Sequence, residues 1–240
     1  MVKKGDTLIE VTLAVGIFSM IAIAVVAVLS NSTSNAQTAL ESTLAREQVD
    51  SQTEALRFIQ SSYINDKDSK YAKLWEEITN NHSIAVDNST YTDKIEEILK
   101  YTPETCDELY EKEGVNSIYF QKAFVINPST LGTFDSDNIG DVLYGANEAV
   151  FKPASTYPRL IDKDNVNGGF TAEGIYVIAV KDHGTTNIAQ GNNSSKTSAF
   201  YDFYIRTCWY GSNADKPSAV STVIRLYNPT ITTTTNTITK

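Results

Sequence analysis

Glu10 is a single carboxylate at the start of a long apolar run, residues 11–29. None of the nineteen residues in that run is charged. As a helix the run would be about 28 Å long, close to the hydrocarbon thickness of a bilayer. A carboxylate at the edge of such a segment costs on the order of a few kcal/mol to bury, so its presence there indicates a function. Glu10 therefore requires a cationic partner.

The orientation of this segment follows from Lys3 and Lys4, which precede it. Positively charged flanks stay on the cytoplasmic side, so the sequence predicts that everything after residue 29 lies outside the cytoplasmic membrane. The net charge of −9 argues against a nucleic-acid partner, which would select a basic face. An acidic surface favours solubility and identifies no partner.

Cys106 and Cys208 are the only two cysteines. Both fall in the part assigned to the outside, where an oxidising compartment allows them to pair. In the chain-entropy model such a disulfide, closing a loop of about 100 residues, contributes roughly 4–5 kcal/mol. Two buried free thiols are the alternative, and the absence of C-x-x-C spacing argues against a metal or redox site.

Asp162, Asp164 and Glu173 occupy the first, third and twelfth positions of a calcium-loop pattern. The pattern is broken by Val166, where an oxygen ligand is needed, and by Asn167, where glycine is needed. A surface turn built from Asp, Asn and Gly is the alternative. Apart from this candidate calcium site, the sequence indicates no cofactor.

Catalytic motifs are missing from the sequence. No G-x-S-x-G, H-E-x-x-H, P-loop or dinucleotide fingerprint occurs. The two histidines, His82 and His183, are expected to be solvent-exposed in polar loops. We therefore expect that the protein is not an enzyme.

The elements that would position Glu10 follow from the apolar periodicity. Residues 30–62 contain no proline or glycine, and apolar residues recur there in steps of three and four, which predicts a helix continuous with the apolar run. A break at the polar residues 31–35 is the alternative. Short helices are expected at 71–78 and 92–101, and from residue 117 alternation of β-branched and aromatic residues predicts a sheet. Its strands are expected at 117–126, 142–144, 148–151, 174–181, 199–210 and 220–227.

The first thirty residues carry a resemblance to a known family. Two lysines, Gly5, four residues, Glu10 and then a membrane-length apolar helix resemble the class III leader of type IV pilins and pseudopilins. The resemblance implies that a prepilin peptidase cleaves between Gly5 and Asp6 and methylates the new amino terminus. It also implies assembly through Glu10, with other pilin or pseudopilin subunits and an inner-membrane assembly platform as partners.

Two features depart from the family pattern. Asp6 stands where the family usually has phenylalanine or another apolar residue, and the apolar segment contains no proline. An ordinary signal anchor, or a secretory signal peptide cut after residue 29, is the alternative to a prepilin leader.

We therefore expect an α+β, pilin-like fold in which a long amino-terminal helix packs on a carboxy-terminal antiparallel β-sheet. The expected segments are a leader (1–5), a transmembrane and assembly half (6–29) and an amphipathic half (30–63) of the helix, a helical or loop insertion (64–116), the sheet domain (117–228) and a threonine-rich flexible tail (229–240).

The expected function is that of a structural subunit, a minor pilin or pseudopilin of a type IV pilus-like or type II secretion-like filament. The protein would cross the cytoplasmic (inner) membrane once, with its amino terminus in the cytoplasm, before entering a filament at the cell surface. The alternative is a single-pass, membrane-anchored extracytoplasmic binding domain that does not polymerise.

Overall fold

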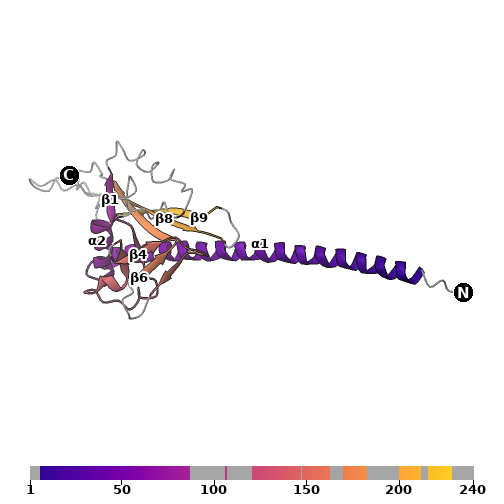
Figure 1. Ribbon diagram of the computed structural model, residues 1–240. Helices are drawn as coiled ribbons and strands as arrows, with labels where there is room; N and C mark the ends of the chain where they lie inside the picture. Colours follow the sequence, from indigo (N-terminus) through magenta and orange to yellow (C-terminus); the bar gives the residue numbers. More distant parts are fainter. Residues whose placement is uncertain are drawn as a thin grey trace, which may run out of the picture. The chain divides into compact units, whose positions relative to one another are not determined.

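A computed structural model describes residues 6–86, 106, 121–146, 148–162, 170–182, 200–211 and 216–228. The chain forms two compact units, Met1–Ser42 and Thr43–Lys240. Figure 1 shows the chain and labels several of its helices and strands. The expected helix at 92–101 and the tail at 229–240 lie outside the described residues.

Helix α1 (Asp6–Asn65) is a single 60-residue helix, which confirms the prediction that the apolar run continues as a helix. The alternative, a break at residues 31–35, is wrong. Thr33 and Thr38 donate hydroxyl hydrogen bonds to the carbonyls four residues earlier, at 2.9 and 3.1 Å. These polar side chains bond to the helix that contains them instead of competing with it.

Helix α2 (Lys70–Asn81) confirms the short helix predicted at 71–78. Ser69 caps its first turn, because the Ser69 hydroxyl accepts a hydrogen bond from the Ala72 N–H at 3.2 Å. At its other end the His82 N–H donates to the Ile78 carbonyl. Leu74, Trp75 and Ile78 form its buried face.

Six strands of the described residues form the main sheet. They are β1 (Ser83–Val86), β2 (Phe124–Ile126), β3 (Leu143–Gly145), β7 (Ile175–Asp182), β8 (Phe200–Trp209) and β9 (Ser218–Tyr227). Their order is β3-β2-β7-β8-β9, with β1 also paired to β7. The last three strands form an antiparallel meander, and the α+β class is confirmed.

Three expectations for the sheet need correction. The sheet is not wholly antiparallel, because β1 runs parallel to β7. The strand expected at 148–151 lies in a separate sheet, of β4 (Ala149–Lys152), β6 (Phe170–Glu173) and β5 (Arg159–Ile161), in which β4 and β6 are parallel. Of the expected strand 117–126, the structure describes residues 121–126, and only Phe124–Ile126 of these are extended. A short 3-10 helix, η2 (Ile139–Asp141), precedes β3.

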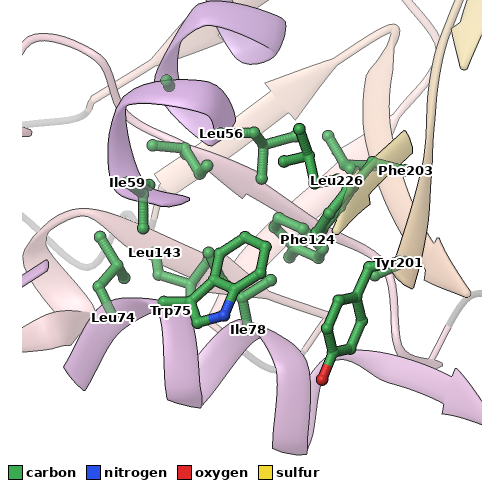
Figure 2. Close-up of a cluster of buried hydrophobic side chains, with 14 of the residues drawn as sticks. Leu56, Ile59, Leu74, Trp75, Ile78, Phe124, Leu143, Tyr201, Phe203 and Leu226 are labelled. Carbon is green, nitrogen blue, oxygen red and sulfur yellow. The ribbon is translucent and has the colours of Figure 1, made fainter. Parts of the chain in front are cut away.

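The core of the second unit lies between the two helices and one face of the main sheet. Leu56 and Ile59 of α1 meet Trp75 and Ile78 of α2, with Phe203 of β8 in the same cluster (Figure 2). The buried positions of α1 in this core follow steps of four and three, as the periodicity predicts. Val49, Leu56, Ile59 and Tyr63 follow these steps, with Gln52 between the first two, and Ala55 is buried beside them.

Candidate functional site

The candidate site is the amino-terminal part of α1. Every described side chain from Leu8 through Leu29 is exposed, although most are large and apolar. Phe18 and Met20 are each 74% exposed. A contiguous apolar surface of this size is not stable in water and marks contact with a membrane or with another protein.

In the part of the chain that the structure describes, α1 is the one helix long and apolar enough to cross a membrane. The hydroxyl groups of Thr12 and Ser19 in this helix do not prevent it from crossing a membrane. Thr12 Oγ1 donates to the Leu8 and Ile9 carbonyls at 3.0 and 2.9 Å, and Ser19 Oγ donates to the Val15 carbonyl at 2.7 Å. Because these donors are satisfied within the helix, they add little cost in an apolar environment.

Glu10 is exposed and forms no hydrogen bond or ion pair with any residue that the structure describes. It lies one turn into α1, where the positive end of the helix dipole favours a carboxylate. That partial charge does not replace a full cation in an apolar setting. Of the two residues at the expected cleavage site, Asp6 is the first residue of α1, and Gly5 lies outside the described residues.

A shallow apolar hollow lies on the same part of α1. It is lined by Ile21, Ala24, Val25, Val28 and Leu29, with the small Ala24 among larger side chains. Its lining has no polar surface. The hollow can therefore accept an aliphatic side chain or a lipid tail, and it offers nothing to a polar ligand.

The carboxy-terminal part of α1 is held by the second unit. Gln52 is fully buried, and its amide forms two hydrogen bonds with the backbone of Ile126, 74 residues away. Trp209 packs near Ala45 on the same helix. Sequence periodicity missed Gln52, although its place between Val49 and Leu56 on the apolar face was a usable signal.

The two cysteines expected to pair do so: Cys106 and Cys208 form a disulfide with their Cα atoms 5.6 Å apart. The Cys106 N–H also donates to the Tyr210 hydroxyl at 3.1 Å. Cys208 lies in β8 and both cysteines are fully buried. The disulfide therefore links residue 106 to strand β8 of the main sheet.

The three candidate calcium ligands are not brought together by the described residues. Asp164 lies outside them, and Glu173 is already engaged by two cations. Lys152 Nζ is 2.6 Å from one carboxylate oxygen of Glu173, and Arg159 Nε is 2.6 Å from the other. Burial opposes the charged form of Glu173, but the hydrogen bonds from Lys152 and Arg159 outweigh it and lower the pKa of this carboxyl. Calcium binding stays a prediction.

His82 was expected to be exposed in a loop, and that expectation is wrong. It follows α2 directly, and its ring lies 5.6 Å from that of Phe124. Its Nδ1 is buried without a hydrogen-bond partner among the described residues. Burial lowers the pKa of His82, against the opposing effect of Glu77 and Glu148. His183 lies outside the described residues.

Gly145 makes room for this imidazole. A Cβ at position 145 would lie 2.5 Å from Cε1 of His82 and 2.7 Å from a carboxylate oxygen of Glu148. Any side chain there would therefore displace both groups.

In the part of the chain that the structure describes, no group of three or more His, Cys, Asp or Glu residues could hold a metal ion.

Comparisons with known proteins add no identity: no family model, no curated protein and no solved structure matches this chain.

Proposed function

We propose that the protein is a minor pilin or pseudopilin, a structural subunit of a type IV pilus-like or type II secretion-like filament. A prepilin peptidase would remove residues 1–5 and methylate Asp6, and the apolar part of α1 would then move from the membrane into a filament of packed helices.

The observation that carries this proposal is that the two ends of α1 differ in burial. One uninterrupted helix exposes an apolar surface from Leu8 through Leu29, while its later residues Leu56 and Ile59 are fully buried in the second unit. A membrane anchor needs only the first property. A subunit that must transmit assembly forces to its outer domain needs the helix itself to be part of that domain's core.

Charge pairing gives Glu10 its role in the proposal. Cleavage after Gly5 would leave an ammonium group on Asp6, four residues before Glu10. In a low-dielectric setting an ammonium and a carboxylate on neighbouring subunits attract more strongly than in water, and neither is stable there alone. A subunit out of register would leave both charges unpaired, so the pair would set the axial stagger between helices.

Asp6 modifies this pairing. Its side chain offers the same ammonium a partner within its own subunit, which weakens the attraction to Glu10 of a neighbour. The intermolecular pair therefore contributes mainly to register, and apolar packing of residues 11–29 contributes most of the association.

The experiment replaces Glu10 by Gln in cells that assemble the filament. Sheared filaments are collected, and the subunit is quantified against the wild-type chain. Glu10→Gln should fall sharply in filaments while its amount in membranes is kept. Glu47→Gln is the matched control, because Glu47 is an exposed glutamate later in α1. Absence of the wild-type chain from filaments would favour the non-polymerising anchored domain, and normal incorporation of Glu10→Gln would remove the charge pairing.

A further inference from the structure

Strand β9 has a long edge that no other described strand covers. It is the last strand of the main sheet, and among the described strands it pairs only with β8, through ten residue pairs from Phe200–Tyr227 to Trp209–Ser218. The carboxy-terminal end of this edge is covered at Tyr227, because Gln60 Nε2 of α1 donates to the Tyr227 carbonyl at 2.7 Å.

The backbone groups that face this edge can be identified from Val220. The N–H of Val220 donates to the Thr207 hydroxyl of β8 at 3.3 Å, and its C=O accepts from the same hydroxyl at 3.0 Å. The backbone groups of Val220 therefore point toward β8. Because successive residues of a strand turn their backbone groups to opposite sides, those of Ala219, Ser221 and Val223 face away from β8. No hydrogen bond to these outward groups is formed by any described residue.

This edge lacks the usual protection against added strands. Natural edge strands are short, or carry charges, prolines or bulges. Residues 218–224 contain no charged residue and no proline, and Ala219, Ser221 and Val223 are exposed. The nearest charge, Arg225, is held by Asp202 through two bonds of 2.7 Å. The edge therefore presents donors and acceptors for one more strand.

A segment suited to that place follows β9 in the sequence. Of residues 229–240, seven are threonine and two are isoleucine. β-branched residues are the ones that strands favour. The segment is uncharged before Lys240, so it brings no repulsive charge to the edge.

The sequence between β9 and this segment disfavours the shortest returns within the same chain. A two-residue hairpin loop of type I′ that contains Pro229 would need positive φ at this residue, which the proline ring forbids. A three-residue loop would place Pro229 second in a type I turn, or Ile231 in the left-handed region, and both are unfavourable. Pro229 thus disfavours these short returns onto the β9 to which the segment is attached, and the cross-linking below separates any return within the chain from addition to another copy.

We propose that the threonine-rich segment 230–239 of one copy adds as a strand to the open β9 edge of a neighbouring copy. Donor and acceptor are different surfaces, so the contact is head-to-tail and can propagate along a filament. The inference rests on the proposed function for the supply of neighbours. Its affinity would come from main-chain hydrogen bonds at Ala219, Ser221 and Val223.

Cross-linking of the full-length chain in detergent micelles tests this contact without a filament. One preparation carries Ser221→Cys, and a second carries Thr233→Cys, Thr235→Cys or Thr237→Cys in turn. The two are mixed and oxidised mildly, with the native disulfide intact. Glu47→Cys, also exposed, replaces Ser221→Cys in the control mixture. At least one tail position should give several-fold more mixed dimer with Ser221→Cys than with Glu47→Cys.

Blocking the edge should remove this difference. Val223→Pro deletes an N–H that faces outward and leaves the β8 ladder paired, so the mixed dimer should fall to the control level. If Val223→Pro is not folded by circular dichroism, Val223→Lys supplies an edge charge with the same expected result.

Two outcomes overturn the inference. One is a mixed dimer no more abundant than the Glu47→Cys control at all three tail positions. The other is a chain carrying both cysteines that cross-links within itself while separate copies do not, which would place the segment on its own β9. Neither outcome depends on whether the chain enters filaments, so this inference and the proposed function can fail separately.

Discussion

Gln52 in α1 binds the backbone of Ile126 in β2 as a neighbouring strand would. Its Nε2 donates to the Ile126 carbonyl at 2.7 Å, and its Oε1 accepts from the Ile126 N–H at 2.9 Å. Both side chains are fully buried. A single amide thus satisfies both polar groups of one backbone residue, and it fixes α1 along its length and in rotation relative to β2.

Replacing Gln52 by leucine should destabilise the protein by about 2–4 kcal/mol, because the buried N–H and C=O of Ile126 would each lose a partner. Thermal unfolding of the full chain in detergent, followed by circular dichroism, measures the loss. Gln48→Leu is the matched control, since Gln48 is a partly exposed glutamine one turn earlier. Equal midpoints for the two variants would show that the Gln52 pairing does not stabilise the fold.

Removing the disulfide should also destabilise the fold. The Cys106–Cys208 bond spans 102 residues. Replacing both cysteines by alanine should cost about 2–5 kcal/mol, the usual range for a native disulfide. Peptide mapping without reductant, on material from the native envelope, should find the two cysteines in one linked peptide. Two free thiols there would contradict the disulfide.

Because His82 is largely buried, we expect the free energy of unfolding to decrease below neutral pH. Burial places its folded pKa below the ordinary 6.5, so below that pH the unfolded chain binds more protons than the folded one. The free energy of unfolding should be constant above pH 6.5 with respect to this group. It should decrease as pH falls from 6.5 to the folded pKa. His82→Gln should flatten this region of the pH profile, and an unchanged slope would contradict the role of His82.

Because Glu173 is paired with two cations, we expect a second decrease in the free energy of unfolding at lower pH. Lys152 and Arg159 hold its pKa below the ordinary 4.5, so its contribution is complete above 4.5 and is lost as pH falls through the folded pKa. At pH 7, Glu173→Gln should cost about 1–3 kcal/mol, between the values for exposed and buried ion pairs. Asp137→Asn is the control, because the pair of Asp137 with Lys73 is exposed and should contribute almost nothing.

The elements with strong periodicity could be predicted from the sequence. The apolar run, the steps of three and four at Val49, Leu56 and Ile59, the aromatic and β-branched residues of β8 and the alternation along β9 each carry many residues with one signal. The strands β1, β5 and β6 were missed. Their extended form depends on partners far away in the chain.

The polar contacts of the second unit could not be predicted in the same way. Glu173 was assigned to a calcium loop from its spacing, but in β6 it faces Lys152 and Arg159 across two neighbouring strands. His82 was assigned to an exposed loop because polar residues flank it, and the contact with Phe124 comes from a strand about forty residues away. Such pairings are fixed by sheet register, which local sequence does not contain.

We propose that the mature chain starts at Asp6, and the mass of its amino-terminal peptide tests this most directly. The peptide from material expressed with a prepilin peptidase should start at Asp6 and carry one added methyl group. Replacing Gly5 by leucine should leave the precursor uncut. An intact Met1 terminus, a cut after residue 29, or normal trimming of the Gly5→Leu chain would contradict the account.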